Sequence, residues 1–354
     1  MTKQTKHLLF LFLFCSNILY AQAGFSHYVC PPCNSSCDEL IFDQSGTCQH
    51  CGMELQAVKK DTHMDQTTPQ KIAFYLQNGV EVLDFAGPME VFSYAGFEVF
   101  TVSKTKAPII SQGILKIIPD YSLEDAPQAN LLAFFGGNGR ASFADSEVQS
   151  WIKAQTDIDY YFSVCTGAFA LAEAQILDQL TATTFHNALD DLERDFPAIK
   201  VVRNARYVDN GKVVTTAGIS AGIDGALHMV AKLKGFNTAR KVAYQMEYDH
   251  WKPGDGLLLS EDNPYSSTFV GTALEAYLGT FEFYNEQQIK LVLNPKDQSL
   301  YANVGEMSYP LFYLENDTFQ DIGNAMVHFK RDNQGKIIGY TTSEQPDLLL
   351  KKLD

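Results

Sequence analysis

The chain has 354 residues, of which 45% are hydrophobic and 19% are charged. This composition is that of ordinary globular domains, and it excludes a disordered chain or a fibre. The formal net charge of −15 at pH 7 would repel a polyanion, which argues against nucleic-acid binding.

The first residues have the pattern of an export signal. Lys3 and Lys6 precede a mostly apolar run over 8–20, and the sequence AQA at 21–23 fits a signal-peptidase site. The apolar run is too short to span a bilayer comfortably. We therefore expect residues 1–23 to be a cleavable signal peptide and the mature protein to be periplasmic or secreted.

A cysteine-rich segment is expected next, at residues 24–57. Cys30 and Cys33 form one C-x-x-C pair, and Cys48 and Cys51 form a second. Two such pairs about fifteen residues apart are typical of a tetrahedral zinc site, because each pair contributes two thiolates. In an exported protein, a disulfide-linked segment without a metal is the alternative.

This segment also resembles a known domain. The sequences YVCPPC and GTCQHCGMEL are similar, over about residues 28–55, to the short heavy-metal-binding domain of metal-transport and efflux proteins. Cys33 stands where that family usually has histidine, which makes the site more like a structural zinc ribbon. Cys37 could be a further ligand, a disulfide partner or a free thiol.

After a polar linker at 58–70, the sequence alternates short β-rich runs with longer amphipathic stretches. This alternation is typical of βαβ units on a parallel sheet. Helices are expected over 144–155 and 222–235, and Asn210-Gly211 predicts a hairpin turn within 205–218. The expected strands of this α/β domain, which covers residues 71–247, are 71–76, 97–103, 130–135 and 160–164.

The pattern changes again after a second linker, rich in turn residues, at 248–267. Short strands separated by polar turns fill residues 268–354, which predicts a small antiparallel β domain. It resembles the β domain that follows secreted serine hydrolases of the penicillin-binding type. Its recurring aromatic side chains indicate a packing role, with ligand binding or substrate capping as the alternative. The expected strands are 289–294, 298–304, 308–316, 325–332 and 336–343.

A lone cysteine of the α/β domain, Cys165, lies where a strand runs directly into a helical pattern. In the sequence YYFSVCTGAFALAEA, small residues follow it, so that the backbone can turn sharply. A side chain on such a turn projects at the C-terminal edge of the sheet, where α/β proteins bind ligands. Free N–H groups at the helix start would lower the thiol pKa. We expect Cys165 to be a nucleophile, with a buried structural cysteine as the alternative.

Two other loops contain candidate partners of this thiol. The sequence FFGGNGR at 134–140 follows an expected strand, and its glycine N–H groups could form an oxyanion hole with that of Thr166. Asp84, in VEVLDFAGPMEVF, lies on a loop that enters a helix. It could cap that helix or, if burial raises its pKa, relay a proton for the thiol.

The sequences LDFAGPMEVF, FFGGNGR and SVCTGAF, together with the GISAGIDGALHMV that follows, resemble the ThiJ/PfpI superfamily, also described as class I glutamine amidotransferase-like. Within it they are most similar to the isonitrile-hydratase-like branch and to the N-terminal domains of some AraC-type regulators. The resemblance covers residues 71–247. It implies a flavodoxin-like sandwich with a parallel sheet, a homodimer, and no cofactor in this domain. A β domain in place of the regulators' helix-turn-helix disfavours transcriptional regulation.

Residue by residue, the resemblance makes Cys165 the nucleophile and Asp84 the acidic residue that faces it. Thr166 matches the residue that assists hydration chemistry, and Gly137 matches the oxyanion glycine. His186, in TTFHNAL, matches the histidine of the family's T-T-H-W motif, although asparagine replaces the tryptophan.

Three further residues complete the comparison. Phe135 replaces the proline of the family's P-G-G-x-G loop, whereas Ser220 and Asp224, in GISAGID, are expected to shape the wall of the site or to cap a helix. We expect an exported enzyme whose thiol attacks a small electrophilic carbon, such as an isonitrile, thioester, amide or reactive carbonyl, in a hydration or hydrolysis reaction. A non-enzymatic module that senses stress, metals or redox state is the alternative.

Overall fold

The computed structural model describes residues 25–29, 41–42, 45–59, 70–138, 140–265 and 271–354. The expected signal peptide and the cysteines Cys30, Cys33 and Cys37 lie outside these ranges. The chain divides into two compact units, Met1–Gln66 and Thr67–Asp354. None of the helices in the described ranges has the length and apolar character needed to cross a membrane.

The first unit contains a small antiparallel sheet. Its strands are β1 (Phe25–Val29), β2 (Ile41–Phe42) and β3 (Gln56–Lys59), with β1 in the middle.

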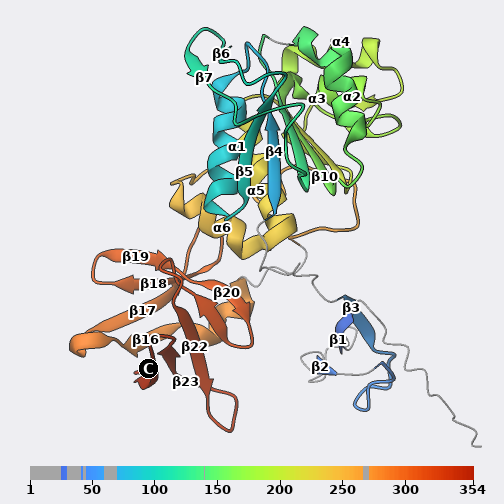
Figure 1. Cartoon of the computed structure of the whole chain (residues 1–354). Helices are drawn as coiled ribbons and strands as arrows, with labels where there is room; N and C mark the ends of the chain where they lie inside the picture. Colours follow the sequence, from blue (N-terminus) through green and yellow to red (C-terminus); the bar gives the residue numbers. More distant parts are fainter. Residues whose placement is uncertain (1–24, 30–40, 43–44, 60–69, 139, 266–270) are drawn as a thin grey trace, which may run out of the picture. The chain divides into compact units, whose positions relative to one another are not determined.

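An eight-stranded sheet forms the centre of the α/β domain in the second unit (Figure 1). Its strands are β4 (Lys71–Tyr75), β5 (Glu98–Ser103), β8 (Tyr121–Ser122), β9 (Leu131–Phe135), β10 (Tyr160–Val164), β13 (Tyr207–Asp209), β14 (Val213–Thr216) and β15 (Leu257–Leu258). Their order is β15-β13-β14-β10-β9-β4-β5-β8, and every neighbouring pair is parallel except β13 and β14. The order β5-β4-β9-β10-β14 is that of flavodoxin-like folds, which bind ligands at the carboxyl ends of the strands near the reversal between β4 and β9.

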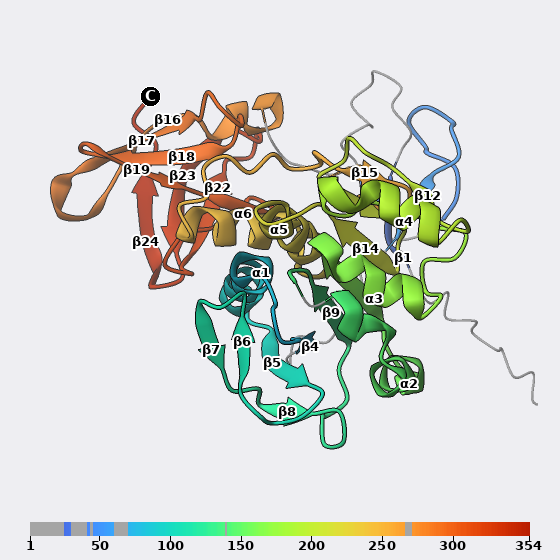
Figure 2. The same ribbon diagram turned by 90° about the horizontal axis from the view of Figure 1, so that it is seen from above.

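Helices cover both faces of this sheet, as Figure 2 shows from above. They are α1 (Val82–Tyr94), α2 (Ser146–Ala154), α3 (Ala168–Glu173), α4 (Leu189–Asp195), α5 (Ala221–Lys234) and α6 (Phe236–Gln245). One core contains Phe74 and Phe162 with α1, α5 and α6, and the other contains Tyr75 and Phe134 with α2, α3 and α4. Because both faces are buried, the strands are apolar on both sides, which is the pattern the sequence showed. Shorter strands flank the sheet, namely β6 (Ile109–Ser111), β7 (Leu115–Ile117), β11 (Thr181–Ala182) and β12 (Lys200–Val201).

The C-terminal part is the expected antiparallel β domain. Its strands are β16 (Gly279–Glu282), β17 (Gln288–Leu293), β18 (Leu300–Val304), β19 (Met307–Pro310), β20 (Phe312–Glu315), β21 (Thr318–Gln320), β22 (Met326–Arg331), β23 (Ile337–Thr342) and β24 (Gln345–Lys351). They form two sheets, β16–β19 and β20–β24, which share a core that includes Phe281, Phe319 and Phe329. The strand expected at 308–316 is two strands, because the N–H of Leu311 bonds to Leu300 and the chain passes there from one sheet to the other.

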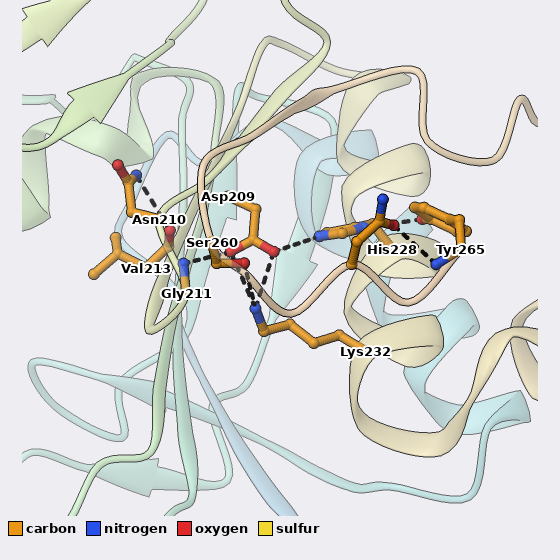
Figure 3. A network of polar contacts seen from close by, with 9 residues as sticks. Asp209, Asn210, Gly211, Val213, His228, Lys232, Ser260 and Tyr265 are labelled. Carbon is orange, nitrogen blue, oxygen red and sulfur yellow. Dashed lines mark hydrogen bonds and ion pairs between the residues drawn. The ribbon is translucent and has the colours of Figure 1, made fainter. Parts of the chain in front are cut away.

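Residues 248–265, expected to be a linker, are joined to the α/β domain, and we call them the connector. Within the connector, β15 pairs with the sheet edge, and a buried polar network holds its end (Figure 3). The fully buried Asp209 carboxylate contacts His228 Nε2 at 2.8 Å and Lys232 Nζ at 3.0 Å. The other ring nitrogen of His228, Nδ1, lies 2.9 Å from the hydroxyl of Tyr265 in the connector.

The charges of this network assign its hydrogen bonds. Asp209 and Lys232 already neutralise each other, so a protonated His228 would leave an uncompensated positive charge among fully buried side chains. We therefore assign a neutral ring whose Nε2–H donates to Asp209, which leaves Nδ1 as an acceptor. The Tyr265 hydroxyl is then the donor that satisfies Nδ1.

Removing that donor should destabilise the domain. Tyr265→Phe leaves a buried ring nitrogen without a hydrogen bond, which we expect to lower the unfolding free energy by about 1–3 kcal/mol. Chemical denaturation followed by fluorescence measures the change. Tyr94→Phe, which removes a hydroxyl from a tyrosine that is 53% exposed, should change it by less than about 0.5 kcal/mol. Equal effects of the two substitutions would contradict the assignment.

Candidate active site

Cys165 follows β10 on a sharp turn, as the sequence predicts. Its φ of +58° lies in the left-handed region, which is uncommon for a residue with a side chain. Two buried bonds hold it there: its N–H donates to Ala217 O at 3.1 Å, and its carbonyl accepts from Thr184 Oγ1 at 2.6 Å. Gly167 follows two residues after Cys165. A Cβ atom at this position would lie 2.2 Å from Phe134 O, so only glycine fits there. The backbone thus presents the thiol at the carboxyl edge of the sheet.

Asp84 lies in the first turn of α1, fully buried beside this thiol. It does not cap the helix, whose N-cap is Glu81. Instead, Oδ1 accepts the Ile219 N–H and Oδ2 accepts the Gly136 N–H, each at 2.9 Å. The Cys165 thiol lies beside the same carboxyl, close enough for each group to act on the pKa of the other. Loops after three other strands therefore meet at one carboxylate.

Burial controls the protonation of this pair. Desolvation raises the pKa of Asp84 to about 6, against the opposing effects of the Ile219 N–H, the Cys165 thiol and the Gly136 N–H. Desolvation, followed by the charge of Asp84, also raises the pKa of the Cys165 thiol well above its usual value. The expectation that the helix start would lower this pKa is therefore wrong, since α3 has only six residues and cannot outweigh burial. At neutral pH the thiol keeps its proton and Asp84 can accept it.

Thr166 and the glycine loop lie next to the sulfur. The Thr166 N–H bonds to Cys165 and lowers its pKa, less than burial raises it. The buried Thr166 hydroxyl also acts on the Cys165 thiol and lowers its pKa. A Cβ atom on Gly136 would lie 2.6 Å from the Thr166 nitrogen and 2.8 Å from the Cys165 Cβ, so this glycine is in close contact with both residues.

Gly137, the expected oxyanion glycine, lies one residue further along the loop. Its φ is +118°, and a Cβ atom there would lie 2.3 Å from Gly79 O. Gly137 and Val80 form an isolated antiparallel β-bridge. Its two hydrogen bonds are donated by the Glu81 N–H to Gly136 O and by the Asn138 N–H to Gly79 O. These bonds do not use the Gly137 N–H. Its role in binding a negative charge stays a prediction.

His186 lies at the surface, and its neighbour Phe185 faces the thiol instead. The imidazole is exposed and packs against the Phe185 ring, with ring centres 4.2 Å apart. A Cβ atom on Gly218 would lie 2.5 Å from Phe185 Cδ2 and 3.4 Å from Cys165 Sγ, so ring, glycine and sulfur are neighbours. The structure therefore brings together Cys165, Asp84 and Thr166, but it places no hydrogen bond between His186 and these residues within the described ranges.

Sequence reasoning missed Ile219. Its φ of +57° is unusual for a β-branched residue, and this conformation directs its N–H to Asp84. The available signal was topological: GIS follows the strand VVTT, whose carboxyl end lies at the same sheet edge as Cys165. Ser220 and Asp224, which we expected near the site wall, lie at the start of α5 and contact Arg206.

Half of the expected metal site is described. Cys48 is buried, its N–H donates to Met53 O at 2.7 Å, and its carbonyl accepts the Gly52 N–H at 2.8 Å. Gly52 has a φ of +77°, which allows the tight turn that carries Cys51. Such a turn suits a two-thiolate knuckle. No group of three or more His, Cys, Asp or Glu side chains suited to a metal ion occurs in the described part, from which Cys30 and Cys33 are absent.

Comparison with known proteins decides the family. The DJ-1/PfpI family matches residues 70–232. Isonitrile hydratase from Pseudomonas putida is 36% identical over 188 residues, which cover 52% of this chain and 81% of that protein. The chain belongs to the DJ-1/PfpI family. A second match, of the heavy metal binding domain family to residues 27–58, identifies such a domain in the first unit.

Two other relatives are less similar to this chain. The HTH-type transcriptional regulator GbdR from Pseudomonas aeruginosa is 24% identical over 189 residues, and the match covers 51% of each chain. The crystal structure of a ThiJ/PfpI family protein from Pseudomonas syringae is 30% identical, with a TM-score of 0.49, and covers 52% of this chain and 78% of that one.

The contact at Gly136 yields a test of the site geometry. A methyl group there overlaps the Thr166 backbone, so we expect Gly136→Ala to lower the unfolding free energy by about 1–3 kcal/mol. It should also change the rate at which iodoacetamide alkylates Cys165, measured by peptide mass spectrometry. Gly323→Ala is the control, because the nearest atom to its Cβ would be 3.3 Å away. Wild-type stability and alkylation in Gly136→Ala would contradict this packing.

Proposed function

We propose that the α/β domain is a cysteine-dependent hydratase that converts small isonitriles to N-substituted formamides. The observation that carries the proposal is the buried Asp84 carboxyl beside the Cys165 thiol, held by the N–H groups of Gly136 and Ile219 and with its pKa raised to about 6. The relative from Pseudomonas putida is named isonitrile hydratase, which supports this substrate class.

In the first step, the isonitrile carbon would accept both the electron pair of the Cys165 sulfur and a proton. Asp84 takes the proton of Cys165 while the sulfur attacks the terminal isonitrile carbon, and that carbon, now electron-rich, takes the proton back from Asp84. The product of this step is a thioimidate, R–N=CH–S, on Cys165. A protonated thiol beside a base suits this addition, because the substrate needs both the nucleophile and the proton.

Water would complete the reaction. Asp84 accepts a proton from water as the water oxygen adds to the thioimidate carbon, and it passes this proton to the imine nitrogen. The C–S bond then breaks as the C=O bond forms, and the proton of the new hydroxyl group passes through Asp84 to the leaving thiolate. R–NH–CHO is released, and the thiol and the Asp84 carboxylate are regenerated. The Thr166 hydroxyl, buried beside the sulfur, is placed to bind that water.

The hydrogen bonds of the glycine loop favour an isonitrile over the amides and thioesters also considered. Acyl substrates develop an oxyanion that needs N–H donors. Here the Gly136 N–H is already donated to Asp84, 2.9 Å away, which leaves the loop fewer donors for an oxyanion. An isonitrile has no carbonyl oxygen, and its first step needs no such donor.

Activity on cyclohexyl isonitrile tests the proposal. We expect Cys165→Ala to lose all measurable formamide production, and Asp84→Asn to lose about 10²–10⁴-fold in kcat/KM. In the wild type, kcat/KM should rise with pH through about 6, because Asp84 must lose its proton to act as a base. Asp84→Asn should lack this rise.

Asp178→Asn, which removes an exposed carboxylate of the same domain, is the matched control and should keep wild-type kcat/KM. Chromatography of the formamide product measures each rate. Turnover by Cys165→Ala equal to the wild type, or a pH profile unchanged in Asp84→Asn, would contradict the mechanism.

We propose further that the heavy metal binding domain holds one zinc ion through Cys30, Cys33, Cys48 and Cys51, as a structural element. The buried Cys48 turn and the match over residues 27–58 support this. Thiolates are the ligands that structural zinc prefers.

Metal analysis of the purified chain from Gly24 onward should find about one zinc per chain. Cys48→Ser should lower the zinc content to less than about half, because it removes one of four ligands. Cys165→Ala removes a thiol of the other unit and should leave the zinc content unchanged. Two disulfides and no zinc, seen by mass spectrometry, would overturn the metal assignment.

A further inference from the structure

The hydrogen bond from Ile219 to Asp84 depends on an unfavourable backbone conformation. A β-branched residue at φ +57° is strained. Such a conformation persists only where the surrounding structure holds it. The residues on either side of Ile219 must therefore be fixed by contacts of their own.

Arg206 makes contacts on both sides of Ile219. Its carbonyl accepts the N–H of Ala217 at 2.8 Å, two residues before Ile219. Its guanidinium Nη2 donates to Ser220 Oγ at 3.3 Å, one residue after Ile219, while Nε donates to Asp224 in the first turn of α5. Backbone and side chain of one residue thus hold both ends of the turn.

The surroundings favour arginine at this position. The Asp224 side chain is only 10% exposed, so its charge needs a partner, whereas Arg206 is 42% exposed and reaches Asp224 from the rim. Beyond the pair lies a cleft of about 270 Å³, which the connector lines with Tyr248, His250, Lys252 and Asp255. The planar guanidinium can bond Asp224 and Ser220 at once, which a lysine ammonium on a flexible stem does less well.

We propose that Arg206 is a positioning residue for the Asp84–Cys165 pair. It touches none of the reacting atoms, and it acts by fixing the turn that presents the Ile219 N–H to Asp84. The proposal rests on the proposed function only for the role of that pair. Its test uses thiol alkylation, so it can succeed even where no isonitrile is turned over.

The test is the pH dependence of Cys165 alkylation by iodoacetamide, followed by peptide mass spectrometry. The titratable groups that act on Asp84 are Cys165 and Glu81, and the variants change neither. In the wild type, the rate should rise with pH through about 6, as the pair loses its first proton. The hydrogen bond from the Ile219 N–H lowers the pKa of Asp84. Arg206→Ala releases the turn, so this hydrogen bond should be lost and the midpoint should move upward by about 0.5–1 pH unit.

Other variants separate positioning from a general loss of structure. Arg206→Lys keeps the charge for Asp224 and should give an intermediate midpoint. Ser220→Ala removes only the Arg206–Ser220 bond and should shift the midpoint in the same direction by less, which keeps the test valid if Arg206→Ala does not fold. Arg203→Ala removes a nearby surface arginine that pairs with Asp190 and Glu193, and it should keep the wild-type midpoint.

A wild-type midpoint in Arg206→Ala and Ser220→Ala, with the fold intact by circular dichroism, would overturn the proposal. A wild-type enzyme that shows no rise near pH 6 would instead count against Asp84 as the base of the proposed function.

Discussion

The buried pair of the Cys165 thiol and the Asp84 carboxyl, in which each group acts on the pKa of the other, is the interaction on which the site depends. A carboxyl in this apolar setting would stay protonated at neutral pH if nothing stabilised its charge. Two backbone N–H groups, from Gly136 and Ile219, offset part of that cost and keep its pKa near 6. The rest of the site is arranged to bring these donors and the thiol to one carboxylate.

The sheet order makes this convergence possible. The carboxyl ends of β9, β10 and β14 lie side by side, with β4 next to β9, so four loops meet at one edge. Two of the loops contain a residue with a side chain in the left-handed region, Cys165 and Ile219. Their strain is offset by buried bonds from neighbouring loops, including those of Thr184 and Ala217. Strain and acid–base chemistry are therefore located in the same few residues.

The sequence predicts the α/β sheet, the elbow at Cys165 and the partner Asp84, because strand-helix alternation and small residues after a cysteine are local signals. It does not predict that Arg206 reaches Ser220, since that contact depends on how β13 and β14 pair. The sequence also does not predict that Phe185, rather than His186, lies near the sulfur. The two residues are neighbours on a short turn, and the conformation of that turn decides which side chain points inward. The direction of the thiol pKa is missed because burial cannot be read from local pattern alone.

The pairing of β15 with β13 has a consequence beyond stability. An uncovered edge strand offers unpaired N–H and C=O groups to a second copy of the same chain, and buried parallel sheets are rich in the apolar residues that favour such association. The connector occupies that edge, although it lies after the family match, which ends at residue 232. The segment between the two domains thus pairs with backbone groups of β13 that the domain, cut at the end of the family match, would leave at an open sheet edge.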